Sequence, residues 1–159
     1  MESKVRKIIP FVDCKSEVPI VKFVFDNGDG AFAVVDTGSE TTLFDFGLLF
    51  SGHKSEFPLK KTRKKINFVG IQNEAETPLI KTNPILKFPD SDNDTGYLHI
   101  EVKDAIFIGL ANLTQHIKDQ YDTDMPISAI FGSDMLSRLN ATINYNTKEV
   151  VIDYDISSQ

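Results

Sequence analysis

Asp36 is the residue whose surroundings in the sequence are best suited to chemistry. It follows the apolar run Ala33-Val34-Val35 and precedes Thr37-Gly38-Ser39, so a strand delivers a carboxylate into a tight turn. Gly38 permits a backbone geometry that a Cβ would obstruct. Backbone N–H groups in such a turn can point at the carboxylate, and the hydroxyls of Thr37 and Ser39 can lock the loop or donate to it. The simpler interpretation is an Asx-type turn at the end of a hairpin strand.

The triplet Asp-Thr-Gly occurs twice, and the two copies have different surroundings. Asp94-Thr95-Gly96 follows the polar loop Asp90-Ser91-Asp92-Asn93 and continues into Tyr97, whereas the first copy follows an apolar strand. A chain of this length contains the triplet by chance roughly three times in a hundred. We therefore interpret the second copy as a loop without a catalytic role.

Two segments resemble the motifs of a known family. Residues 33–44 match the active-site signature of aspartic proteases at every position. Residues 127–139 resemble the second hallmark of single-lobe, retropepsin-like proteases, in which two apolar residues and a glycine pack behind the Asp loop. Those residues are Ile130, Phe131 and Gly132 in this chain.

The resemblance covers most of residues 18–154. The segments 110–117 and 142–152 are similar to the helix before, and the hairpin after, the second hallmark in bacterial members. The resemblance implies a closed, all-β barrel and an endopeptidase that acts on polypeptide without a cofactor or metal. It also implies that Asp36 is catalytic, that Thr37, Gly38 and Ser39 shape its loop, and that a flap tip lies at Val69, Gly70 and Ile71.

Aspartic proteolysis needs two carboxylates that share one proton, because like charges about 3 Å apart cannot both ionise. Asp36 supplies one of them, and Asp94 follows too soon in the chain for a duplicated-lobe enzyme. We therefore expect a homodimer in which Asp36 of a second chain, related by a two-fold axis, is the partner. The alternative is a non-catalytic module that uses the same barrel to bind peptide or protein, since a fold alone does not guarantee activity.

The remaining pattern predicts the elements that position Asp36. Alternating apolar residues predict a hairpin of strands 18–25 and 31–35 around Asn27-Gly28-Asp29-Gly30. Further strands are predicted over 66–71, 78–88, 97–108, 140–145 and 149–154. Short helices are predicted over 110–119 and over 132–139, the latter capped by Ser133 or Asp134, with a helical turn or two in 43–50. We expect one all-β domain over 1–159 with two or three short helices.

Composition excludes several function classes. The 159 residues carry a formal net charge of −6, which disfavours a general nucleic-acid binder. Cys14 is the sole cysteine, so an intrachain disulfide and a thiolate zinc cluster are excluded, and we interpret it as an inert small residue. No apolar run has the length of a membrane span, and the charged start of the chain leads directly into a strand-like segment. We expect a cytoplasmic protein that binds no membrane.

Three other groupings are weaker candidates. The basic run Lys60, Lys61, Arg63, Lys64 and Lys65 lacks interleaved aromatic residues, so we interpret it as a solvated strand edge leading into the flap hairpin. Asp90, Asp92, Asp94 and Glu101 have calcium-loop spacing, but the glycine falls one place late and the flanking strands exclude the helices that such a loop requires. His53, His99 and His116 have neither metal-ligand nor catalytic spacing.

Overall fold

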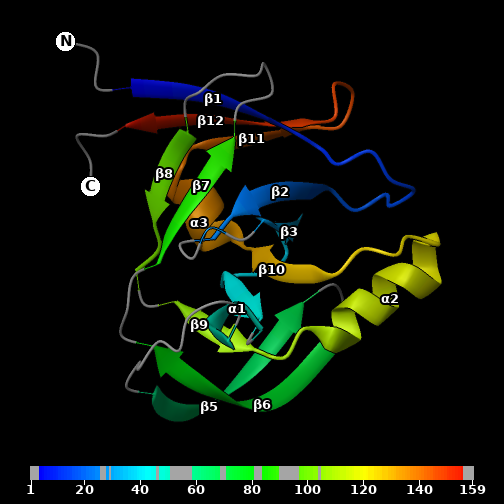
Figure 1. Cartoon of the computed structure of the whole chain (residues 1–159), viewed down its shortest axis with the longest axis vertical. Helices are drawn as coiled ribbons and strands as arrows, with labels where there is room; N and C mark the ends of the chain where they lie inside the picture. Colours follow the sequence, from blue (N-terminus) through cyan, green and yellow to red (C-terminus); the bar gives the residue numbers. More distant parts are fainter. Residues whose placement is uncertain are drawn as a thin grey trace.

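The structure is a computed structural model that describes residues 4–25, 28, 30–45, 47–50, 59–68, 71–80, 84–89, 97–103 and 105–155. Strands dominate it, and three short helices are interspersed among them (Figure 1). In chain order the elements are β1 (Lys4–Pro10), β2 (Ile20–Val24), β3 (Gly30–Val35), β4 (Leu43–Asp45), α1 (Gly47–Phe50), β5 (Leu59–Phe68), β6 (Ile71–Ile80), β7 (Ile85–Pro89), β8 (Tyr97–Glu101), β9 (Ile106–Ile108), α2 (Ala111–Tyr121), β10 (Ile127–Phe131), α3 (Ser133–Arg138), β11 (Ala141–Asn144) and β12 (Glu149–Asp155).

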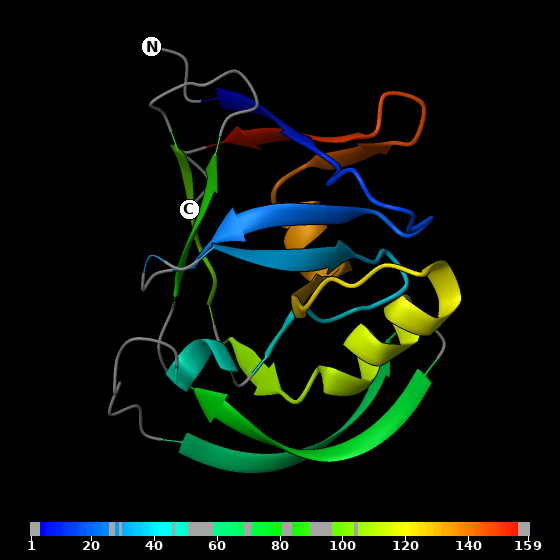
Figure 2. The ribbon, with the colours of Figure 1, turned by 45° about the vertical axis from the view of Figure 1, so that its right-hand side comes forward.

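The strands form two sheets. A nine-stranded sheet has the order β5-β6-β9-β4-β10-β3-β2-β7-β8, and a three-stranded sheet has the order β1-β12-β11. The large sheet curls strongly, so that the β5–β6 hairpin lies at the opposite end of the molecule from the three-stranded sheet (Figures 1 and 2). This arrangement confirms the predicted all-β fold with short helices.

The strand that carries Asp36 lies in the middle of the large sheet. β3 pairs antiparallel with β2 and parallel with β10, and β10 pairs in turn with β4. Successive residues of these strands face two different apolar cores: Ala33 and Val35 pack into one, and Val34 into the other. Central strands that are buried on both faces need continuous apolar sequence, which is why Ala33, Val34 and Val35 form an unbroken run.

The first core lies between the large sheet and the three-stranded sheet, and it is rich in phenylalanine. Phe131 packs against Phe23 and Phe88, with ring centroids 5.3 Å and 5.7 Å away. The second core lies against α2, whose Leu113 and Ile117 are fully buried. β10 contributes to both cores through alternate residues, so the segment behind the Asp36 loop is held from two sides.

The hairpin prediction and both longer helix predictions are confirmed, while three strand predictions are wrong. The strand predicted over 66–71 is divided between β5 and β6, which pair antiparallel with Phe68 opposite Ile71. The single strand predicted over 78–88 is divided between β6 and β7, and the one predicted over 97–108 is divided between β8 and β9. β6 and β9 pair with one another, whereas β7 and β8 form a separate hairpin next to β2. Apolar alternation continues through 78–88 and through 97–108, so it cannot show that the chain changes its pairing partner within each segment.

The helical turn predicted within 43–50 is confirmed as α1, which covers only the second half of that segment. The structure has the strand β4 first, because Leu43 and Phe44 are fully buried between β10 and β9. The Asp45 carboxylate then ends this strand: Oδ2 accepts from the Gly47 N–H at 2.9 Å and Oδ1 from the Leu110 N–H at 2.9 Å. Helix α1 begins only at Gly47.

Candidate active site

Asp36 is held at the end of β3 by the neighbouring strand. Its backbone N–H donates to the carbonyl oxygen of Phe131 at 3.0 Å, continuing the β3–β10 pairing by one residue. The preceding Val35 is buried, whereas Asp36 is half-buried and the following Thr37 and Gly38 are exposed. The carboxylate therefore leaves a rigid strand just where the chain reaches the surface.

The turn after Asp36 is organised around its carboxylate. The Gly38 N–H donates to Asp36 Oδ1 at 2.9 Å, and the Ser39 N–H donates to the Asp36 carbonyl at 3.2 Å. A Cβ on Gly38 would lie 3.1 Å from Asp36 Oδ1, closer than almost all real Cβ contacts. A glycine at this position therefore leaves room for the close approach of the carboxylate.

Ser39 locks the loop from inside. Its side chain is 2% exposed, and its Oγ donates to the Thr41 carbonyl at 2.8 Å. Of the two roles predicted for this hydroxyl, the structure shows the loop-locking one. Thr37 is exposed on the same turn.

The segment predicted to support the loop does lie directly behind it. Ile130 and Phe131 are buried in different cores, and Gly132 follows at the point where β10 meets the Asp36 loop. A Cβ on Gly132 would lie 2.6 Å from the Ser39 carbonyl oxygen and 2.7 Å from that of Thr41. Only glycine fits this contact without moving the backbone of the loop.

Helix α3 is tied to the loop through residues that the sequence did not identify as part of the site. Gly132 is its N-cap residue instead of the predicted Ser133 or Asp134, although the Asp134 carboxylate does accept from the Met135 N–H of the first turn at 2.7 Å. In addition, the Ser133 N–H donates to the Ser39 carbonyl at 2.7 Å, and the Asp134 carboxylate accepts from Thr42. A buried hydroxyl within a signature loop, such as Thr42, is the signal that could have indicated this link.

The predicted flap falls on the β5–β6 hairpin. Ile71 is the first residue of β6 and pairs with Phe68, while Val69 and Gly70 lie outside the described residues. The basic run belongs to β5, which is at one end of the nine-stranded sheet, as expected for a strand edge. The second Asp-Thr-Gly triplet also lies outside the described residues, together with Asp90 and Asp92.

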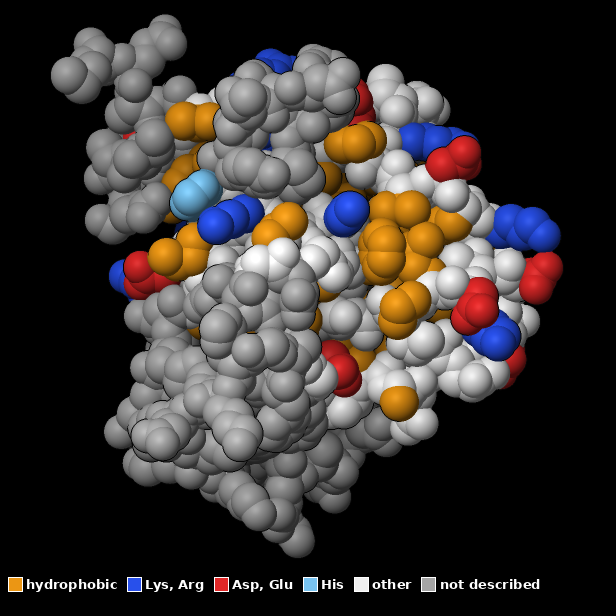
Figure 3. Space-filling view, in the orientation of Figure 1, with side chains coloured by type: hydrophobic (Ala, Val, Ile, Leu, Met, Phe, Trp, Pro, Cys, Tyr) orange, Lys and Arg blue, Asp and Glu red, His pale blue; other side chains and the backbone are white. Residues whose placement is uncertain are grey.

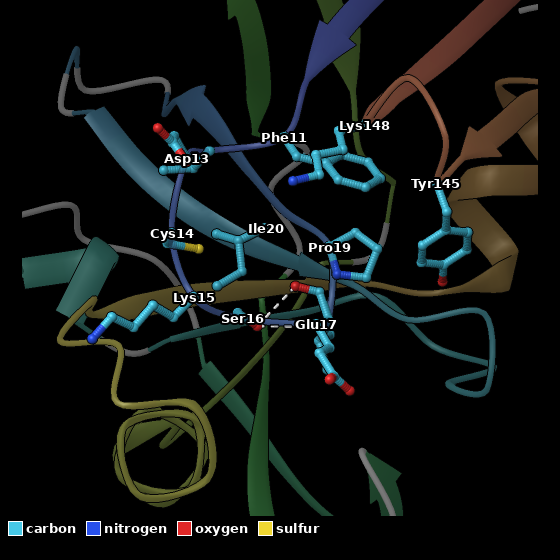
Figure 4. Close-up of a pocket in the computed structure, with 12 residues that line it drawn as sticks. Phe11, Asp13, Cys14, Lys15, Ser16, Glu17, Pro19, Ile20, Tyr145 and Lys148 are labelled. Carbon is cyan, nitrogen blue, oxygen red and sulfur yellow. Dashed lines mark hydrogen bonds between the residues drawn. The ribbon is translucent and has the colours of Figure 1, made fainter.

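A hollow of about 510 Å³ lies beside the strand that carries Asp36. It is lined by residues 11–20 together with Tyr145 and Lys148 (Figure 4). The Pro19 carbonyl in its wall accepts from the Val35 N–H at 2.9 Å, so the hollow starts next to the end of β3. Tyr145 is 62% exposed and makes an edge contact with Phe11. On the face of the molecule that Figure 3 shows, apolar side chains form a patch with charged side chains around it.

The described part of the chain shows neither a cluster of metal ligands nor a membrane-spanning helix. No group of three or more His, Cys, Asp or Glu side chains there is arranged to hold a metal ion. No helix among these residues has both the length and the apolar character to cross a bilayer.

Comparison with solved structures identifies the fold. No protein-family model and no curated protein matches the sequence. A retropepsin-like aspartic protease from Rickettsia conorii matches with a TM-score of 0.50 and 11% identity, over 95% of this chain and 90% of that one. The retroviral protease-like domain of Ddi1 from Leishmania major matches with a TM-score of 0.46 and 14% identity, over 91% of this chain and all of that one. The chain therefore has the fold of the retropepsin-like aspartic proteases that its two sequence motifs resemble.

Proposed function

We propose that this chain is an aspartic endopeptidase that hydrolyses peptide bonds as a homodimer, with Asp36 of each subunit forming the catalytic dyad. The observation that carries the proposal is the setting of Asp36. Its carboxylate sits at the end of a buried central strand, accepts the Gly38 N–H, and is followed by two exposed residues. The retropepsin-like fold supports the same assignment.

The chemistry follows from two carboxylates that share one proton. The ionised Asp36 takes a proton from water as that water attacks the peptide carbonyl. The protonated Asp36 of the other subunit stabilises the oxyanion that develops and then protonates the leaving amine. The Gly38 N–H, 2.9 Å from Asp36 Oδ1, helps to hold this carboxylate in position for the first of these steps.

The dimer supplies what one chain lacks. A dyad needs a second carboxylate about 3 Å from the first. Thr37 and Gly38 are exposed beside Asp36, so a second copy has access to this face. A two-fold axis through this face would bring the two carboxylates together, because an isologous interface places the same residue of each subunit on both sides of the axis. A stable dimer of this kind should bury on the order of 2,000 Å² or more.

A second candidate function is peptide or protein binding without catalysis. The hollow beside β3 and the exposed ring of Tyr145 favour it, because a recess lined by both apolar and charged side chains next to an exposed aromatic side chain suits recognition of a peptide. This function needs no second carboxylate, so it predicts a monomer, or a dimer whose two Asp36 carboxylates are far apart.

Peptide cleavage by the wild type and by Asp36→Asn, measured from about pH 3 to 8, tests the proposal. The substitution keeps the shape of the side chain but removes its charge and the shared proton. We expect kcat to fall at least about 10³-fold, with fold and dimer retained. The wild-type rate should be bell-shaped against pH and maximal on the acid side of neutrality, because turnover needs one proton on the pair.

Two further measurements separate the candidates. A transition-state mimic with a central hydroxyl should bind the wild type and not Asp36→Asn, and sedimentation at micromolar concentration should show a dimer for both. Equal cleavage by the two proteins would exclude the protease assignment. A wild type that cleaves nothing, sediments as a monomer and still binds peptide would favour the binding function.

A further inference from the structure

Thr42 and Asp134 connect the Asp36 loop to the start of helix α3. We propose that this pair positions the Asp36 carboxylate, so that the geometry of the catalytic group depends on two side chains that do not touch the reacting atoms. The effect on turnover rests on the proposed function, whereas the effect on the geometry of the loop does not.

Thr42 is the centre of the connection. It is 4% exposed, and its hydroxyl donates to Asp134 Oδ1 at 2.7 Å while accepting from the Gly132 N–H at 3.0 Å. Its own N–H donates to Asp134 Oδ2 at 3.1 Å. One threonine therefore uses its backbone donor and both functions of its hydroxyl to hold three atoms of the 132–134 segment.

Asp134 completes the connection from the outer side. Asp134 is exposed to solvent, yet both of its carboxylate oxygens accept hydrogen bonds from Thr42. Oδ1 also accepts from the Met135 N–H at 2.7 Å. An ionised carboxylate can accept from all three donors at once, since it has acceptor capacity on both oxygens. Charge-assisted bonds of this kind are stronger than neutral ones.

The restraint reaches Asp36 through short backbone paths. Gly132, held by the Thr42 hydroxyl, follows Phe131, whose carbonyl accepts the Asp36 N–H. On the other side, the Ser133 N–H holds the Ser39 carbonyl, and the Ser39 N–H donates to the Asp36 carbonyl. The loop is thus fixed to the 131–134 segment at its start, middle and end. Loosening the end at Thr42 should let the whole turn shift.

The test compares matched threonine substitutions. Thr42→Val keeps the side-chain volume but removes the hydroxyl, and Thr42→Ser restores it. Thr114→Val is the control, because the Thr114 hydroxyl accepts from the Ile127 N–H at 3.0 Å, the same kind of bond at the other end of β10. Turnover of peptide by each purified full-length variant is measured alongside its urea unfolding curve.

We expect Thr42→Val to lower kcat on the order of 10- to 100-fold with KM changed less than about threefold, because a small misplacement of a catalytic group has this effect. Thr42→Ser should recover most of the rate, and Thr114→Val should keep it even if its unfolding midpoint falls. Asp134→Ala should lower kcat in the same way, and the double variant should be no slower than Thr42→Val alone by more than about twofold, since the two act as one unit.

A second readout does not depend on catalysis. The amide resonance of Gly38, whose N–H donates to Asp36 Oδ1, reports on the turn directly. Thr42→Val and Asp134→Ala should shift it and speed its hydrogen exchange at least about tenfold, while Thr114→Val leaves it unchanged. An unchanged Gly38 amide in both variants would overturn the positioning role. A wild type without Asp36-dependent turnover would instead overturn the proposed function, and the Gly38 amide would still decide the positioning role.

Discussion

The two ends of β10 are built with the same device but in different surroundings. At the start, the Thr114 hydroxyl accepts the Ile127 N–H at 3.0 Å; at the end, the Thr42 hydroxyl accepts the Gly132 N–H at 3.0 Å. Around the start, α2 packs fully buried apolar side chains against the sheet. Around the end, backbone carbonyls, hydroxyls and a carboxylate of the Asp36 loop and α3 contact one another.

The difference separates stability from precision. Apolar burial is non-directional, so the α2 end of β10 contributes free energy of unfolding without fixing any one atom closely. Hydrogen bonds depend on direction and distance, so the Asp36 end fixes the carboxylate at a modest net gain in stability. Substitutions among the apolar side chains under α2 should therefore change stability alone, while those among the hydrogen-bonding groups of the Asp36 loop should change turnover.

Leu113→Ala should have the largest effect on stability. A fall in turnover in this variant would contradict the contrast between the α2 end and the Asp36 end of β10. Leu113 is fully buried in the core under α2, so removing most of its side chain leaves a cavity. We expect the free energy of unfolding to fall by about 2–5 kcal/mol in urea titration. The kcat per folded molecule should stay at the wild-type value, and a tenfold loss would mean that the α2 end also positions the site.

Gly132→Ala should destabilise less and yet lower activity. The added Cβ meets backbone oxygens of Ser39 and Thr41 at 2.6 and 2.7 Å, so the loop must move. We expect a loss of about 1–3 kcal/mol in the free energy of unfolding, together with a clear fall in kcat.

Gly109→Ala is the matched control for Gly132→Ala, because a Cβ there meets nothing within 4 Å. It should change the free energy of unfolding by less than about 0.5 kcal/mol and leave kcat unaltered. Equal behaviour of the two alanine variants would contradict the tight packing of the loop against Gly132.

Asp94→Asn should have the smallest effect and sharpens the assignment of the site to the end of β10. The second Asp-Thr-Gly triplet follows a polar loop in the sequence, so we expect a change of no more than about 0.5 kcal/mol in urea titration and normal peptide cleavage. Loss of turnover with a normal unfolding curve would mean that the catalytic triplet is the second one.

Much of the fold could be predicted from local pattern. The β2–β3 hairpin follows from alternation around a glycine-rich turn, and α2 from the spacing of Leu110, Leu113 and Ile117. Pairing between distant strands could not be predicted in this way. Alternation shows which residues face a core but not which strand lies alongside, so it does not predict the divisions between β6 and β7 and between β8 and β9.

The part of the candidate site that is local in sequence could be predicted, and the part that depends on contacts between distant segments could not. Asp36 and Gly38 are neighbours in the chain, so the turn could be inferred from their types. The link from Thr42 to Asp134 joins residues far apart in sequence, and only the packing of β10 beside β3 and β4 brings them together. The resemblance indicates Gly132, whereas the physical reason for a glycine there, its contact with two loop carbonyls, follows only from the three-dimensional structure.

The pairing of β1 with β12 has a consequence for how the molecule folds. The two strands run side by side from Lys4 opposite Asp155 to Pro10 opposite Glu149, so nearly the whole chain lies between them. Closing so long a loop costs more entropy than closing a hairpin, and proteins rich in such non-local pairings fold slowly. We expect the hairpins β2–β3, β7–β8 and β11–β12 to form first and β1 to dock late. Until it does, the side of β12 that faces away from β11 has no partner strand, and association between folding chains is most favoured in that interval.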